Sequence, residues 1–256
     1  MKLQGQVALV TGASRGIGRA IAHGLAAEGA SVAVNYRSGR AEAMELVQQI
    51  ESNGGKALPI EGDVADYERA KDVVQQTIDG LGGLDILVNN AGIAKNALIF
   101  NMEPADWVDV MRVNFGGVFN CTKAAMGHFM ARGSGVIVNV SSVMGERGWV
   151  GESNYAASKG AVNAFTRCCA MELARFGVRV NAVLPGFAPT GLVAELMEKD
   201  GGKGIRRQIP MRSFATVDQV AQAVVFLAGP DSSYMTGSLM PVDGGASTAL
   251  GLGAPL

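Results

Sequence analysis

The sequence predicts an α/β protein with a single Rossmann-type, doubly wound parallel sheet of about seven strands and helices on both faces. Two observations carry this prediction. Short apolar runs alternate with amphipathic helical segments, and the connections are short, which is the pattern of repeated β-α units. Polar or glycine-rich turns follow the predicted strands, where an open parallel sheet binds its ligands. At 256 residues, we expect one domain, residues 1–256, that combines dinucleotide binding and catalysis.

Composition and charge argue against several classes of function. The formal net charge of −1 gives no electrostatic reason to expect binding to nucleic acid or to an anionic membrane. No apolar run approaches the ~18 residues of a membrane span, and residues 1–6 show no signal peptide. The cysteines and histidines match no zinc spacing and no disulfide framework: Cys121, Cys168, Cys169, His23 and His128. We therefore expect a cytoplasmic protein without a metal site, with cysteines in the core and structural histidines.

The first predicted strand, Val7–Val10, runs into the turn T-G-A-S-R-G-I-G, and a helix with apolar residues at a spacing of four follows. A buried strand, a glycine-rich turn and a helix N-terminus together form an anion site. Glycines let the backbone approach a pyrophosphate, and the free N–H groups favour negative charge. We therefore predict that a dinucleotide binds here, at Gly12, Ser14, Arg15, Gly16, Ile17 and Gly18.

The second predicted strand, residues 31–34, leads into Asn35, Tyr36 and Arg37, which are further candidates for binding the cofactor. An NAD site usually has an acidic residue here to bind the ribose hydroxyls, and this chain has none. A guanidinium pairs well with a 2′-phosphate, which a carboxylate would repel. Arg15 and Arg37 therefore favour NADP(H), with an ordinary exposed loop arginine as the alternative interpretation of Arg37.

The chain then continues with alternating elements. We predict a helix over 42–50, a strand over 57–60, a helix over 67–78 and a strand over 85–88. The apolar residues expected to point inward from the first of these helices are Met44, Val47 and Ile50. The turns after the two strands supply more cofactor candidates: Asp63, Val64, Asn90, Ala91 and Gly92. Asp63 could equally be a turn or cap residue without a ligand.

A long helix is predicted to begin at Pro104 and to run towards Arg132. It contains Asn114 followed by F-G-G, and these are poor residues for a helix interior, so we expect a kink or an irregular turn there. This helix and the one after Tyr155 both carry more than one apolar stripe. A helix of this kind must bury two of its faces, and we expect one to pack on the sheet and the other on a partner subunit.

The candidate chemistry lies in residues 139–160. A predicted strand over 136–140 is followed by Ser142, and a helix would place Tyr155 and Lys159, at i and i+4, on one face. A nearby ammonium favours the phenolate, so we expect Lys159 to lower the pKa of Tyr155 towards that of a general acid/base. A Tyr-x-x-x-Lys pair alone usually marks a solvated helix face. The preceding Ser-Ser and glycine-rich loop, followed by N-Y-A-A-S-K, favour catalysis.

The last predicted elements are a strand over 178–184, a helix over Val217–Ala228 and a strand over 237–242. Pro185, Gly186 and Thr190 follow the first of these strands and are cofactor candidates. Residues 192–204 are rich in Met, Glu, Lys and Gly, which indicates a substrate lid within the wider region 187–213.

The motifs T-G-A-S-R-G-I-G, N-N-A-G and N-Y-A-A-S-K resemble those of the short-chain dehydrogenase/reductases, and the resemblance covers essentially the whole chain. With V-N-Y-R and V-D-G-G, the chain is most similar to the 3-oxoacyl-[acyl-carrier-protein] reductases of that family. This implies NADPH-dependent reduction of a β-ketoacyl thioester in lipid metabolism by a homotetramer.

The resemblance also implies roles for single residues. Tyr155 would protonate the nascent alkoxide while Ser142 orients and polarises the carbonyl. Lys159 would hold the ribose, and Asn114 would hold a water that links the lysine to solvent. Other implied cofactor contacts are adenine at Asp63 and Val64, and the carboxamide or pyrophosphate at Thr190.

Two departures from the family pattern bear on the substrate. Phe176 stands where such reductases often have a basic residue, and the active-site loop has Glu146, Trp149 and Glu152 where neutral, smaller or amide residues are usual. The alternative function is a dehydrogenase of a sugar, a polyol or another small alcohol or ketone. A non-catalytic nucleotide sensor is disfavoured by the intact Asn-Ser-Tyr-Lys set. Candidates for binding an acyl carrier protein and its phosphopantetheine arm are Arg132, Arg175, Arg206, Arg207, Leu196 and Met197.

Overall fold

Seven parallel strands form one sheet in the order β3-β2-β1-β4-β5-β6-β7 in this computed structural model, which describes residues 1–189 and 200–248. The strands are β1 (Val7–Val10), β2 (Ser31–Tyr36), β3 (Ala57–Glu61), β4 (Ile86–Asn89), β5 (Gly135–Val140), β6 (Val178–Pro185) and β7 (Leu239–Val242). Strand β1 pairs with both β2 and β4, so the chain changes its direction across the sheet there. The crevice outside the carboxyl ends of the strands at such a point is where open α/β sheets bind ligands.

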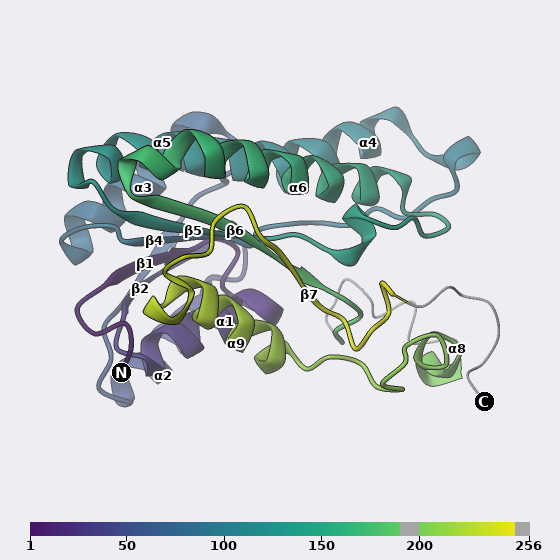
Figure 1. Ribbon diagram of the computed structural model, residues 1–256, viewed down its shortest axis with the longest axis horizontal. Helices are drawn as coiled ribbons and strands as arrows, with labels where there is room; N and C mark the ends of the chain where they lie inside the picture. The colour runs from purple at the N-terminus through teal and green to yellow at the C-terminus, as the bar shows by residue number, and fades with distance from the viewer. Residues whose placement is uncertain (190–199, 249–256) are drawn as a thin grey trace.

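Helices cover both faces of the sheet (Figure 1). One face carries α1 (Gly16–Ala27), α2 (Arg40–Ser52) and α9 (Val217–Ala228). The other carries α3 (Tyr67–Leu81), α4 (Pro104–Met111), α5 (Gly117–Arg132) and α6 (Ser153–Leu173). The short helix α8 (Lys203–Arg206) lies away from both layers, and 3-10 turns follow β5 and α6 as η3 (Val143–Gly145) and η4 (Ala174–Phe176). The prediction of a doubly wound parallel sheet is confirmed.

An apolar core on each face explains why the strands appear in the sequence as continuous apolar runs. All residues of β1 are buried. Val10 belongs to the cluster that contains Leu25 of α1, whereas its neighbour Leu9 belongs to the cluster that contains Phe129 of α5. A strand that is buried on both sides cannot alternate apolar and polar residues.

The irregular turn predicted around Asn114 is present. A π-helical segment, η2 (Arg112–Gly116), separates α4 from α5, and Asn114 is fully buried within it. π-Helical turns inside α-helices are often found at functional sites, because they redirect a side chain at a cost in regular hydrogen bonding.

Two expectations about the core are wrong. Met44 is exposed, because the buried face of α2 is formed by Ala43, Leu46, Val47 and Ile50. Met44 lies about 100° round the helix from Ala43, at 3.6 residues per turn. Cys121 and Cys169 are buried as expected, but Cys168 is exposed. The structural interpretation of His128 agrees with its contact, since its Nε2 accepts a hydrogen bond from the Leu84 N–H at 3.1 Å.

Candidate active site

The turn after β1 packs its backbone against the loop that follows β4. Gly12 has a φ of +62° and Gly16 a φ of +57°, which a glycine adopts without strain. A Cβ on Gly18 would stand 2.4 Å from Asn90 Nδ2, so this approach needs a glycine. Helix α1 begins here, and the side chain of its N-cap residue, Arg15, makes no capping hydrogen bond. The helix therefore presents N–H groups to an anion without a side-chain cap in the way.

Thr11 joins the two loops and was missing from the predicted site. Its hydroxyl oxygen accepts hydrogen bonds from the N–H groups of Asn90 at 2.9 Å and Ala91 at 3.1 Å. Its carbonyl accepts a third from Asn90 Nδ2 at 2.9 Å. A hydroxyl residue directly after a buried strand was the signal in the sequence that could have identified it.

The Asn35 side chain lies inside the protein, at the end of β2. Its Oδ1 accepts a hydrogen bond from the Gly12 N–H at 3.4 Å, and its Nδ2 donates to the carbonyls of Ile60 at 3.2 Å and Gly62 at 3.1 Å. Tyr36 beside it is also buried. These two predicted site residues thus connect and pack the ends of the first three strands.

Arg37 lies on the surface close to Asp63. One nitrogen of its guanidinium is 3.9 Å from Asp63 Oδ2, and a nitrogen of Arg112 is 3.8 Å from the same oxygen. The other carboxylate oxygen accepts a hydrogen bond from the Ala65 N–H at 3.0 Å, so Asp63 is also a turn residue. The structure thus shows Asp63 as a turn residue, and its contact with the cofactor stays a prediction. The other predicted residues at this end are buried or partly buried: Ser14, Ile17 and Val64.

Ser142, Tyr155 and Lys159 come together at the carboxyl end of β5. Ser142 is 7% exposed and makes a side-chain hydrogen bond with Tyr155. Lys159 is 4% exposed, and its Nζ donates to the Val140 carbonyl at 2.9 Å. The same nitrogen is 5.7 Å from the centre of the Tyr155 ring. The structure thus brings together the three side chains that the sequence placed in one site.

Asn114 faces the same site from η2. Its amide forms two hydrogen bonds with the Ile93 backbone, at 2.8 and 2.9 Å, and its Nδ2 donates to Ser158 Oγ at 3.1 Å. A Cβ on Gly92 would stand 3.3 Å from Asn114 Oδ1 and 3.7 Å from Lys159 Nζ. The asparagine and the lysine therefore both lie close to the position that a Cβ on residue 92 would take, and a glycine there permits their approach.

Burial dominates the pKa of Tyr155. It raises the pKa to about 12; the hydrogen bond with Ser142 opposes the rise, and the negative charge of Glu152 adds to it. Burial also lowers the pKa of Lys159 from 10.5 to about 8. The expectation of a lowered Tyr155 pKa is therefore wrong for this structure. The ammonium is directed to the Val140 carbonyl, and its own burial disfavours its charge.

Other predicted residues lie at the end of β6 or outside the described ranges. Gly186 donates its N–H to the Val242 carbonyl at 3.0 Å, and a Cβ on it would stand 2.8 Å from Asp243 Cα. Thr190, Leu196 and Met197 lie outside the described residues. So do residues 192–199 of the lid predicted over 192–204.

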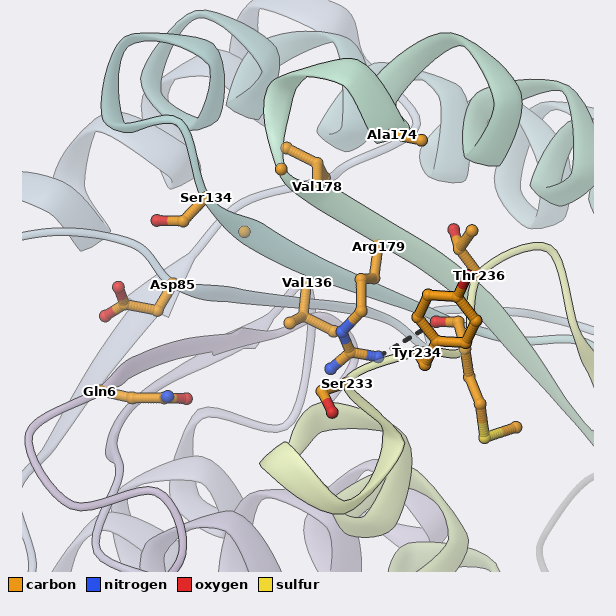
Figure 2. A pocket seen from close by; sticks show the side chains of 13 residues that line it. Gln6, Asp85, Ser134, Val136, Ala174, Val178, Arg179, Ser233, Tyr234 and Thr236 are labelled. Carbon is orange, nitrogen blue, oxygen red and sulfur yellow. Dashed lines mark hydrogen bonds between the residues drawn. The ribbon is translucent and has the colours of Figure 1, made fainter.

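A cavity of about 740 Å³ lies at the opposite edge of the sheet, where the strands begin (Figure 2). Its polar lining includes Gln6, Asp85 and Arg179. None of the predicted catalytic or cofactor residues in the described ranges lines it. The candidate active site is thus at the carboxyl edge of the sheet.

Comparison with known proteins identifies the family to which the chain belongs. A family model described as "Enoyl-(Acyl carrier protein) reductase" matches residues 12–247, which include the turn after β1 and the whole of α6. The chain belongs to the short-chain dehydrogenase/reductase family. It is an oxidoreductase of that family.

Similar members of the family are known from sequence and from structure. The 3-oxoacyl-[acyl-carrier-protein] reductase FabG of Staphylococcus aureus is 41% identical over 93% of this chain and 96% of its own. The FabG of Thermotoga maritima is 42% identical over 96% of this chain and 99% of its own. A gluconate 5-dehydrogenase from Burkholderia cenocepacia, in complex with NADP and tartrate, matches with a TM-score of 0.93 and 36% identity, covering 97% of this chain and 98% of that one.

Two further observations concern the described residues of this short-chain dehydrogenase/reductase. Residues 1–189 and 200–248 contain no cluster of three or more His, Cys, Asp or Glu side chains suited to a metal ion. No helix in the same ranges has the length and apolar character needed to cross a bilayer.

Proposed function

We propose that this short-chain dehydrogenase/reductase is an NADPH-dependent reductase of the 3-oxoacyl-[acyl-carrier-protein] type, acting on a β-ketoacyl thioester in the cytoplasm. The observation that carries the proposal is the 41% identity to the Staphylococcus aureus reductase over 93% of the chain. The convergence of Ser142, Tyr155 and Lys159 at the carboxyl edge supports carbonyl reduction as the reaction.

The residues around the turn after β1 fit an NADP(H) molecule. The N-terminus of α1, which no side chain caps, suits the pyrophosphate. The Arg37 side chain is 54% exposed, and its contact with Asp63 is 3.9 Å long, so the guanidinium can pair with a 2′-phosphate instead. The gluconate 5-dehydrogenase that resembles this chain binds NADP.

In this reaction the chain's residues manage the proton while NADPH, when bound, supplies the hydride. Because the pKa of Tyr155 is raised to about 12, its hydroxyl is protonated at neutral pH and suited to donate. Ser142, hydrogen-bonded to the same phenol, orients the carbonyl oxygen that receives the proton. The ketone gains a hydride at carbon and a proton at oxygen, which gives the alcohol.

Lys159 and Asn114 are placed to return the proton to Tyr155. With a pKa lowered to about 8, Lys159 can exchange a proton near neutral pH more readily than an ordinary lysine. Asn114 Oδ1 and Lys159 Nζ both lie close to the Cβ position that Gly92 leaves empty, and a water bound between them would continue the path to solvent.

The carrier-protein part of the proposal has weaker support. Three of the four arginine candidates already have partners: Arg132 pairs with Asp85 at 2.7 Å, Arg175 stacks on Phe176, and Arg206 stacks on Phe214. The resembled reductases often have a basic residue at position 176. In this chain the Phe176 ring stacks with the guanidinium of the neighbouring Arg175 instead. Acyl carrier protein, coenzyme A thioesters and free β-ketoesters all remain substrates to be compared.

The second candidate function is oxidation of a sugar acid or polyol. The observation that favours it is the TM-score of 0.93 with the gluconate 5-dehydrogenase. Its identity to this chain, 36%, is lower than that of the FabG reductases, so we place it second.

The experiment that separates the two is a substrate panel assayed at matched concentrations with NADPH or NADP. The panel contains acetoacetyl-carrier protein, acetoacetyl-CoA, gluconate and neutral polyols. We expect the highest kcat/KM with a thioester. Turnover of a sugar or polyol with no activity on either thioester would leave only the family assignment.

We also propose that the protein is a homotetramer. Large apolar side chains are exposed on the helical face that carries α5 and α6: Phe119, Met130 and Met171. Phe119 and Phe115 make edge-to-face contacts with Phe165, which forms a preorganised aromatic patch. Light scattering should give about four times the chain mass of 26.5 kDa. A monodisperse monomer at micromolar concentration would contradict this.

A further inference from the structure

Lys159 and Glu152 are the only Asp, Glu, Lys, Arg or His side chains that are buried in the described part of the chain. Lys159 has a partner, because its Nζ donates to the Val140 carbonyl. The Glu152 carboxylate has no hydrogen bond or ion pair to any described residue, although the side chain is only 9% exposed. A buried carboxylate without a partner costs several kcal/mol of solvation, so its presence beside the reacting groups calls for a reason.

Glu152 stands at the entrance to α6, on the side of the helix that carries Tyr155. It is the residue before Ser153, and its carbonyl accepts a hydrogen bond from the Ala156 N–H at 2.8 Å. Residues at i and i+3 are neighbours on a helix surface, which places Glu152 next to Tyr155. Its charge accordingly contributes to the raised pKa of that phenol.

The neighbouring loop holds Glu152 in this position. The Gly151 carbonyl accepts a hydrogen bond from the Ala97 N–H at 2.9 Å, and the Glu152 N–H donates to the Trp149 carbonyl at 3.1 Å. Trp149 in turn packs edge-on against Phe187, with ring centres 5.4 Å apart. The backbone at Glu152 is therefore held by the loop on both of its sides.

No cation among residues 1–189 and 200–248 forms an ion pair with Glu152. Lys95 reaches this region through its carbonyl, which accepts from Asn154, but its ammonium pairs with Asp106 at 2.7 Å and Asp109 at 2.9 Å. A negative substrate group that entered beside Tyr155 would thus meet an unscreened negative charge. Two unit charges 6 Å apart repel each other by about 3 kcal/mol at an effective dielectric constant of 20.

We propose that Glu152 is a specificity-determining residue that excludes substrates with a carboxylate beside the reacting carbonyl and admits neutral ketones such as esters and thioesters. This inference rests on the proposed role of Tyr155 as the acid. Glu152 would therefore select substrates by their charge and not by their length.

The test compares two ketones that share one reacting carbonyl, acetoacetate and ethyl acetoacetate, with NADPH in the wild type and in Glu152→Gln. The amide keeps the shape of the side chain and removes the charge. We expect the wild type to prefer the neutral ester in kcat/KM, and Glu152→Gln to narrow that preference at least about tenfold, mainly through KM for acetoacetate. The matched control is Glu146→Gln, an exposed carboxylate in the same loop, which should leave the ratio unchanged.

The inference would be overturned if the ratio of kcat/KM for ethyl acetoacetate to that for acetoacetate is unchanged or larger in Glu152→Gln. The proposed function is checked separately with 5-ketogluconate and the neutral ketose L-sorbose. If both acetoacetyl thioesters fail as substrates while this ketose pair is reduced, the thioester assignment falls. The charge effect is still decided by acetoacetate and its ester, because the carboxylate of 5-ketogluconate lies at the other end of the carbon chain from its ketone. A wild type that reduces none of these ketones would overturn both.

Discussion

The two edges of the sheet both contain charged groups, but these groups differ in burial and in partners. At the amino edge, the half-buried Arg179 donates to the carbonyls of Leu227, Gly229 and Met235, and Asp85 pairs with Arg132. Arg179 and Asp85 line the cavity there (Figure 2). At the carboxyl edge, Lys159 has one carbonyl partner and Glu152 has none in the described residues. The amino edge also has the cavity of about 740 Å³.

This difference shows that volume is a poor guide to the active site in this protein. The charged groups that line the large cavity have hydrogen-bond partners, and these bonds contribute to stability. The groups at the carboxyl edge are buried with few partners, which costs stability and leaves them free to act on a ligand.

The largest effect should come from the carboxyl edge, with Tyr155→Phe. Removing the hydroxyl takes away the proton donor and leaves the ring, so kcat should fall at least ~100-fold while NADPH still binds. Steady-state kinetics and a fluorescence titration of NADPH measure the two quantities. The control is Tyr234→Phe at the amino edge, where the side chain is fully exposed, and it should retain wild-type turnover. Near wild-type activity of Tyr155→Phe would show that the acid has been misassigned.

Replacing the half-buried Arg179 and the buried Lys159 by methionine should change the free energy of unfolding in opposite directions. Arg179→Met leaves several buried acceptors without a donor and should lower the free energy of unfolding by about 2–4 kcal/mol. Lys159→Met removes a charge whose burial lowers its pKa from 10.5 to about 8, a cost of about 3 kcal/mol at neutral pH. After allowing for the lost hydrogen bond to Val140, it should raise the free energy of unfolding by roughly 1–3 kcal/mol and abolish activity.

The pH dependence checks the sign of the lysine effect. Between about pH 8 and 10.5 the unfolded chain binds a proton at Lys159 that the folded chain does not, so wild-type stability should rise with pH in that window. The advantage of Lys159→Met should be complete below pH 8 and vanish above 10.5. Denaturant unfolding at one protein concentration across this range measures it. A difference that does not change with pH would mean that the lysine is not desolvated.

The smallest effect should be on the choice of cofactor. The wild type should favour NADPH over NADH in kcat/KM, and Arg37→Asp should reduce that preference about tenfold by replacing a phosphate partner with a repelling carboxylate. Arg175→Asp makes the same charge change on an exposed residue near the amino edge and should leave the preference unchanged. Equal kcat/KM values with NADPH and NADH in the wild type would contradict the predicted preference for NADPH.

Much of this protein was determined by the sequence alone, where the signal is local. Apolar runs located every strand within a few residues, because a strand buried on both faces must be apolar throughout. The poor helix formers at 114–117 predicted a kink or irregular turn, and the motif spacing placed Ser142, Tyr155 and Lys159 in one site.

The tertiary structure decided the rest. It showed that the Asn35 side chain bridges strand ends, and that the pKa of Tyr155 is raised where the sequence suggested a lowering. Desolvation depends on all the atoms around a group, and those come from segments far apart in the chain, so no local pattern records it.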